Sequence, residues 1–117
     1  MDRVLISDLS ARCIIGVNEH ERREKQDVLI NLTIYTDMRA AAHSDRIEDA
    51  VDYRELRTRV VEMVEESQFY LLEALAQAIA DVCLDQKGVS KVTARVDKPG
   101  ALHFARSVAV EIERERA

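Results

Sequence analysis

Residues 27–35, DVLINLTIY, alternate between side chains that suit a core and side chains that suit a surface. The members that share one face are all aliphatic: Val28, Ile30, Leu32 and Ile34. A period of two residues is that of a β-strand covering a core on one side only. Antiparallel sheets commonly have one packed face and one solvated face, so this stretch predicts such a sheet.

Two helices and three further strands are predicted around this stretch. Asp52, followed three residues later by Glu55, resembles a capping box, and the apolar spacing after it predicts a helix from about Tyr53 to Ser67. A second apolar stripe predicts a helix that starts at about Leu71 and ends before Gly88. Strands are expected within residues 4–17 and around 92–96 and 108–112, and residues 38–51 are ambiguous, with room for a short helix.

The order ββααββ predicts an α+β fold, in which both antiparallel helices pack on one face of a four-stranded antiparallel sheet. The length of 117 residues predicts a single domain over 1–117. With 47% hydrophobic and 33% charged residues the chain can bury a core, although a small one, so association with other copies is an expected source of stability.

The formal charge of −5 argues against nucleic acid and anionic membranes as partners, since both need clustered Lys and Arg. Residues 21–25, ERREK, interleave both signs and are interpreted as a solvated surface, with contact to an anionic substrate as the alternative. No signal-peptide pattern starts the sequence, and no apolar run reaches the roughly 20 residues of a membrane helix. The expected location is the cytoplasm.

The residues that usually hold metals show no ligand spacing. The histidines at 20, 43 and 103 form no close pair, and neither Cys13 nor Cys83 has a Cys-x-x-Cys partner. Both cysteines are interpreted as buried thiols, which favours a reducing compartment, although two cysteines also allow one disulfide. Phosphate-binding glycine loops and the Gly-x-Ser-x-Gly motif are absent as well. We therefore expect neither a metal nor an organic cofactor.

Four polar residues are candidates for chemistry, and each also has an ordinary structural explanation. Lys98 precedes Pro99 and could be well aimed, but exposed lysines are common in turns. Glu73 in the first turn of the second helix either complements the helix dipole or accepts a planar donor pair such as that of a pterin. Tyr53 could be a packing residue with a wet hydroxyl group, and Glu21 a solvated carboxylate.

Four segments, in this order and spacing, resemble the dihydroneopterin aldolase family along nearly the whole chain. They are Gly16-Val17 with Glu21 four residues on, Val51-Asp52-Tyr53, Phe69-Tyr70-Leu71-Leu72-Glu73, and Lys98-Pro99-Gly100-Ala101. The resemblance implies the tunnelling fold, in which subunits join their sheets into a barrel, as a homo-tetramer or a homo-octamer of two tetramers. It also implies a small-molecule pterin as the partner.

The resemblance further implies roles for single residues. Lys98 would be the principal acid/base group, Tyr53 a proton-transfer partner from a neighbouring subunit, and Glu21 the holder of the substrate side chain or its water. Glu73 would anchor the pterin, and Leu72 and Asp52 would also bind the substrate. The chain departs from the family in residues 18–21, NEHE, where many aldolases carry aromatic residues before the acid, which affects the expected side-chain preference.

The implied reaction is a lyase reaction, the retro-aldol cleavage of 7,8-dihydroneopterin in folate biosynthesis. The alternative is a dihydroneopterin triphosphate 2'-epimerase or a dual enzyme. Lys98-Pro99-Gly100-Ala101 favours the aldolase, whereas Gln26-Asp27-Val28 and the segment around His103 resemble the epimerase. A non-enzymatic, self-associating pterin-binding module is the third possibility.

Overall fold

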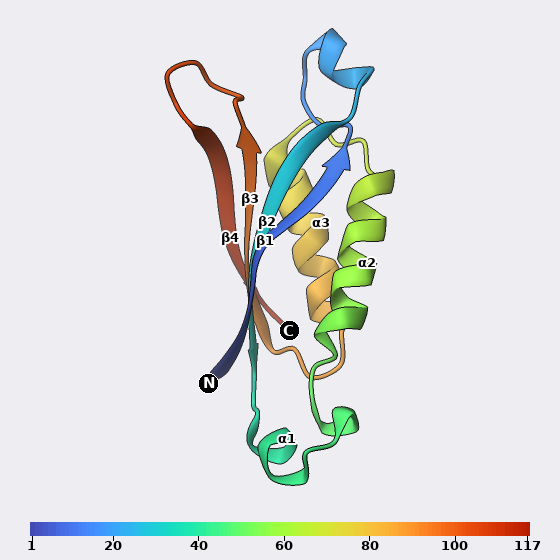
Figure 1. Cartoon of the computed structure of the whole chain (residues 1–117), viewed down its shortest axis with the longest axis vertical. Coiled ribbons are helices and arrows are strands. Elements are labelled where there is room, and N and C mark those ends of the chain that lie inside the picture. Colours follow the sequence, from blue (N-terminus) through green and yellow to red (C-terminus); the bar gives the residue numbers. More distant parts are fainter.

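The fold consists of a four-stranded antiparallel sheet with two long helices on one of its faces, as Figure 1 shows for the computed structural model of residues 1–117. The strands follow one another across the sheet in chain order: β1 (Asp2–Cys13), β2 (Gln26–Thr36), β3 (Lys91–Pro99) and β4 (Ser107–Glu115). The helices α2 (Tyr53–Glu66) and α3 (Leu72–Asp85) lie between β2 and β3 in the sequence. The predicted order ββααββ is therefore confirmed.

The core lies between the sheet and the two helices. Val28, Ile30 and Ile34 of β2 are 0% exposed, as the alternation predicts. The inward residues of β3, Val92, Ala94 and Val96, are also 0% exposed. The inward residues of β4 are only partly buried, because β4 is the edge strand.

The first strand is shorter than predicted. It ends at Cys13, so residues 14–17 leave the sheet although they are apolar. Ile15 and Gly16 stay buried there and lead into the connection to β2. The pairing of β1 with β2 also shifts its register between Ile6 and Leu9, where Asp8 adopts a φ of 54°.

Both long helices have 14 residues and run in opposite directions (Figure 1). Asp52 caps α2, since its Oδ1 accepts hydrogen bonds from the backbone N–H groups of Arg54 and Glu55, both at 3.1 Å. The ambiguous residues 38–51 contain the short helix α1 (Arg39–Ser44) and a 3₁₀ turn, η2 (Ile47–Asp49). None of the helices has the length and apolar character needed to cross a membrane.

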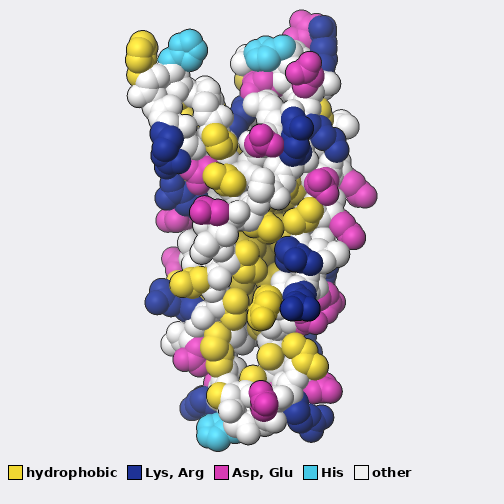
Figure 2. Space-filling model, in the orientation of Figure 1, with side chains coloured by type: hydrophobic (Ala, Val, Ile, Leu, Met, Phe, Trp, Pro, Cys, Tyr) yellow, Lys and Arg dark blue, Asp and Glu magenta, His cyan; other side chains and the backbone are white.

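The two ends of the molecule carry different connections. The connection from β1 to β2, the end of β3 and the start of α3 lie at one end of the 51 Å long axis, at the top of Figure 1. The starts of α1 and α2 lie at the other end. Figure 2, in the orientation of Figure 1, shows a band of apolar side chains along the middle of the visible surface, flanked by charged groups. β1 borders the sheet with an unpaired edge and carries three partly buried apolar residues, Val4, Ile6 and Leu9.

Candidate active site

Lys98 lies near the end of β3, where the chain turns into the hairpin that leads to β4. Pro99 ends the strand, and Gly100 adopts a φ of +73°, a conformation that glycine reaches without strain. The side chain of Lys98 is only 12% exposed. It is therefore not an ordinary exposed turn lysine, since its ammonium group is held within the fold.

The partner of Lys98 is Glu21, which comes from the 3₁₀ helix η1 (Glu19–Arg22) in the connection between β1 and β2. The Lys98 Nζ donates to Oε2 of Glu21, and the Glu21 side chain is also 12% exposed. Gln26 Nε2 donates to the same oxygen at 3.2 Å, and the backbone N–H of Asn18 donates to Oε1 at 3.2 Å. The Glu21 carboxylate is thus fixed by three hydrogen-bond donors and is not solvated.

These donors stabilise the charged form of Glu21. The hydrogen bond from Lys98 is the largest cause, and it lowers the pKa of Glu21 from 4.5 to about 2, with Gln26 and the Asn18 N–H acting in the same direction against the cost of burial. At neutral pH Glu21 is therefore a fixed carboxylate that accepts a hydrogen bond from Lys98. Such a pair can orient hydroxyl groups and move a proton without a change in net charge.

Gly16 makes room for this carboxylate. It has a φ of +128°, and a Cβ atom built there would lie 2.3 Å from the Glu21 Cδ and Oε1 atoms. Its backbone is held from the other side, since its N–H donates to the Phe69 carbonyl at 3.3 Å. Only glycine allows this approach, which explains the break in the apolar run at this position.

Glu73 and Leu72 occupy the first turn of α3, at the same end of the molecule as Lys98 and Glu21 (Figure 1). Glu73 is exposed and Leu72 is partly buried. The residue before the helix is Leu71, which has no polar side chain to cap the free N–H groups. This end of α3 therefore offers a carboxylate and backbone donors to a ligand.

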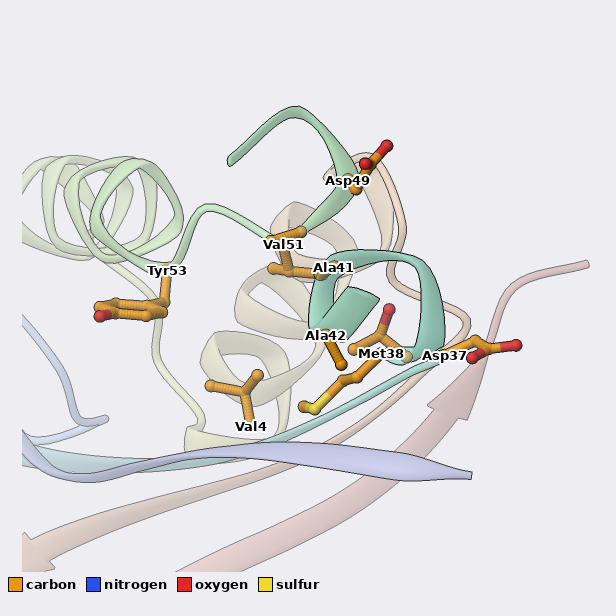
Figure 3. A pocket seen from close by; sticks show the side chains of 10 residues that line it. Val4, Asp37, Met38, Ala41, Ala42, Asp49, Val51 and Tyr53 are labelled. Carbon is orange, nitrogen blue, oxygen red and sulfur yellow. The ribbon is translucent and has the colours of Figure 1, made fainter. Parts of the chain in front are cut away.

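Tyr53 and Asp52 lie at the start of α2, at the opposite end of the molecule. The ring of Tyr53 lines a groove of about 320 Å³, together with Val4, Met38, Ala41 and Val51 (Figure 3). Its side chain remains exposed, at 57% for the residue. The carboxylate of Asp52 is engaged as the cap of α2, which fixes the position of the neighbouring Tyr53.

Within one chain these two groups of residues are far apart. Thr36 of β2 lines the Tyr53 groove, whereas Leu29 of the same strand pairs with Asp97, next to Lys98. At about 3.3 Å per residue, the seven steps from Leu29 to Thr36 separate the two ends by about 23 Å. The structure therefore brings Lys98, Glu21 and the start of α3 to one end, and leaves Tyr53 and Asp52 at the other.

The sequence did not reveal the roles of three residues around Glu21, although Gly16 and Gln26 belong to segments that carry the family resemblance. Gln26 supports Glu21, Gly16 accommodates it, and Arg22 is half-buried with three hydrogen bonds to backbone carbonyls. The interpretation of residues 21–25 as a solvated surface is therefore wrong for the first two, and holds for Arg23, Glu24 and Lys25, which are exposed. The available signal was a glycine that interrupts an apolar run and is followed by Glu21 and Arg22, and an analysis of periodicity does not detect it.

The two cysteines are free, buried thiols, as interpreted. Burial raises the pKa of Cys83 to about 12 and also raises that of Cys13. No three His, Cys, Asp or Glu side chains are grouped so that they could hold a metal ion.

Comparison with known proteins gives relatives of two activities. The dihydroneopterin triphosphate 2'-epimerase of Pseudomonas aeruginosa is 40% identical over 116 residues, which cover 99% of this chain and 94% of that protein. The dihydroneopterin aldolase of Escherichia coli K12 is 35% identical over 114 residues, covering 97% and 93%. The folic acid synthesis protein FOL1 of Dictyostelium discoideum is 40% identical over 97% of this chain, and the chain spans only 17% of its length.

Solved structures agree with these relatives. The E. coli dihydroneopterin aldolase in complex with neopterin superposes with a TM-score of 0.93 at 35% identity, covering 97% of this chain and 99% of that one. A Burkholderia dihydroneopterin aldolase bound to guanine gives 0.83 at 25% identity, covering 99% and 92%. The family model described as dihydroneopterin aldolase (FolB) matches residues 4–113. This chain therefore belongs to the dihydroneopterin aldolase family.

Proposed function

We propose that this protein is a lyase of folate biosynthesis that cleaves 7,8-dihydroneopterin into 6-hydroxymethyl-7,8-dihydropterin and glycolaldehyde. The observation that carries the proposal is the held pair of Lys98 and Glu21, placed at the same end as the uncapped start of α3 in a chain of this family. Two related proteins crystallise with neopterin or guanine, whose fused rings share one planar donor edge. A pterin is the ligand that this combination suits.

The substrate supplies its own electron sink. In 7,8-dihydroneopterin an N5=C6 imine adjoins C1', so removal of the C2' hydroxyl proton lets the C1'–C2' bond break. Glycolaldehyde leaves, and the electron pair forms an enamine between C1' and C6 as N5 takes a proton. Protonation of C1', with loss of the proton from N5, then gives the hydroxymethyl product. The protein needs to position the substrate and move protons, and a metal or an organic cofactor is not part of the proposal.

Each site residue has one task in this scheme. Lys98 is the principal acid/base group, and Glu21, ionised beside it, holds the dihydroxypropyl side chain or its water. Glu73 accepts the donor edge of the pterin, and Leu72 packs beside the ring at the start of α3. Tyr53 is the proton-transfer partner, and Asp52 contributes by fixing the first turn of α2 on which Tyr53 stands.

Within one subunit Tyr53 lies at the end of the molecule opposite to Lys98, so the proposal requires a second subunit. Another subunit would bring its Tyr53 to the Lys98 end of the first, in a ring of four or in two stacked rings. The unpaired edges of β1 and β4 support this arrangement, since exposed edges pair readily with other strands. The single domain over 1–117 would then be one wedge of a barrel.

The second candidate is the dihydroneopterin triphosphate 2'-epimerase, alone or together with the aldolase. It is favoured by the 40% identity to the P. aeruginosa enzyme of that name. The same bond cleavage can serve both reactions. If C1' of the enamine adds back to the opposite face of the aldehyde carbon C2', that carbon is inverted. The two functions therefore differ in whether the aldehyde leaves.

Purified protein is incubated with 7,8-dihydroneopterin and, separately, with its triphosphate, in the presence of EDTA, and the products are separated by chromatography. We expect hydroxymethyldihydropterin and glycolaldehyde from the first substrate, with Lys98→Ala as the inactive control. An inverted triphosphate as the only product would replace the aldolase by the epimerase. A rise in melting temperature with pterin but no turnover of either substrate would leave a pterin-binding module instead.

A further inference from the structure

Arg22 joins two segments that are far apart in the sequence. Its Nη1 donates to the carbonyls of Gly16 at 3.1 Å and Phe69 at 3.0 Å, and its Nη2 donates to the carbonyl of Gln68 at 2.6 Å. The guanidinium carbon also lies 3.9 Å from the centroid of the Tyr70 ring. One side chain thus fastens the connection between β1 and β2 to the connection between α2 and α3.

The fastened backbone is the surface on which the Glu21 carboxylate rests. Gly16, whose carbonyl accepts from Arg22, leaves the space that the carboxylate fills. Arg22 also directly follows Glu21 in η1, so its anchoring fixes the end of that turn. If Arg22 released these carbonyls, the turn that carries Glu21 would lose its side-chain link to the connection between α2 and α3, and the hydrogen bond from the Gly16 N–H to the Phe69 carbonyl would remain.

We propose that Arg22 is a positioning residue that holds Glu21 against Lys98 and that turnover depends on this hold. The dependence of turnover rests on the function proposed above. Arg22 is not assigned contact with the substrate, because both of its terminal nitrogens already donate to backbone carbonyls and its guanidinium lies over the Tyr70 ring. A planar fork with five N–H donors suits three carbonyls and a stacked ring, and a lysine at this position would reach only part of them.

The neighbouring Arg23 provides a matched control. It has the same side chain one residue further along, but it is 70% exposed and pairs only with Glu19. A surface pair of this kind contributes little. Arg23→Gln should therefore change neither turnover nor the position of Glu21, and any effect of Arg22→Gln that exceeds it reports the contacts of Arg22.

The kinetic test is a double-mutant cycle. Arg22→Gln should lower kcat by on the order of 100-fold, the effect of displacing a catalytic group by about 1 Å, with a smaller change in KM. In the Glu21→Ala background the same substitution should cost less than about threefold, because there is no carboxylate left to hold. Equal losses in both backgrounds, or no loss in either, would overturn the proposal. Arg22→Lys, which keeps the charge, is measured in parallel in case Arg22→Gln does not fold. Its kcat should lie between the values of the wild type and Arg22→Gln.

The structural test does not need turnover. Carboxylate carbon chemical shifts of Glu21 are titrated in the wild type, in Arg22→Lys or Arg22→Gln, and in Arg23→Gln. The pKa of Glu21 should rise from about 2 toward 4.5 in the Arg22 variants alone, as the hydrogen bond from Lys98 is lost. An unchanged pKa in a folded Arg22 variant overturns the proposal. If the wild type neither cleaves 7,8-dihydroneopterin nor epimerises its triphosphate, the proposed function fails. This titration still decides whether Arg22 positions Glu21.

Discussion

Glu21 and Lys98 form an ion pair across 77 residues of sequence, between a 3₁₀ turn and the end of a β-strand. Each side chain is only 12% exposed. A pair this sheltered from water is screened less than a surface pair and fixes both of its members. The polar part of the proposed site therefore exists before any substrate arrives.

The first prediction concerns the stability of the protein at low pH. Glu21 has a pKa of about 2 in the folded chain against an ordinary value of 4.5, so its contribution to stability is complete above about pH 4.5 and disappears as the pH falls toward 2. Glu21→Gln should therefore lower the free energy of unfolding at pH 7, and the difference from the wild type should shrink steadily below pH 4.5. Urea unfolding at several pH values measures this difference.

Glu24→Gln serves as the control for this series, because Glu24 is an exposed carboxylate on the same connection. It should show little change at any pH. A deficit of Glu21→Gln that stays the same from pH 7 to pH 2.5 would mean that the ion pair does not stabilise the folded state.

The second prediction separates binding from chemistry. Glu73→Ala should weaken pterin binding by about 2 to 5 kcal/mol if the bound pterin covers the carboxylate of Glu73, which is exposed in the free chain, because this is the range for loss of one partner from a buried, charge-assisted pair. Lys98→Ala should keep measurable binding and lower kcat by roughly two to four orders of magnitude. Calorimetry with neopterin gives the affinity directly, since KM need not equal Kd. Normal binding by Glu73→Ala, or a loss of affinity alone in Lys98→Ala, would reverse the assignment.

The third prediction tests whether two chains share a site. Lys98→Ala and Tyr53→Phe are each expected to be nearly inactive, and refolding them together should restore activity. In a random one-to-one mixture, roughly a quarter of the sites between neighbouring subunits receive both intact residues. Lys98→Ala mixed with Glu21→Ala is the control and should restore nothing, since those residues lie at the same end of one chain. Recovery in neither mixture would mean that Lys98 and Tyr53 of different chains do not share a site.

The fourth prediction concerns the start of α2. Asp52→Ala removes the oxygen that accepts from Arg54 and Glu55 and should cost about 0.5 to 2 kcal/mol of stability. Asp52→Asn keeps an accepting oxygen and should stay within about 0.5 kcal/mol of the wild type. Thermal and urea unfolding compare the two variants. Equal stability of both would show that the cap contributes nothing measurable.

The sheet and the helices could be predicted because they obey short periods. The aliphatic face of β2 and the stripe of α3 each follow from local spacing, and packing enforces what the spacing indicates. The end of β1 could not be predicted in this way, because residues 14–17 are apolar and yet leave the sheet. Of these residues only Ile15 and Gly16 are buried, Ile15 in the main core and Gly16 against Glu21, and a run of apolar residues does not reveal which neighbour covers each of them.

The candidate site was predictable only in part. Lys98, Glu21, Glu73 and Tyr53 came from the order of four short motifs, but the ion pair between the first two did not, since it spans 77 residues and starts in an irregular turn. Arg22 was misread because mixed charges on a loop are usually solvated. Its three carbonyl partners come within reach only once the chain has folded.

If the Tyr53 groove and the Lys98 end, about 23 Å apart, form one site between subunits, protein concentration controls catalysis. If both ends are needed, a dissociated subunit carries two incomplete half-sites and turns over nothing. Specific activity should then fall on dilution below the dissociation constant of the assembly, and substrate that bridges two subunits should oppose that fall, because a ligand stabilises the state that binds it. The same pterin that is consumed would thereby help to hold its catalyst together.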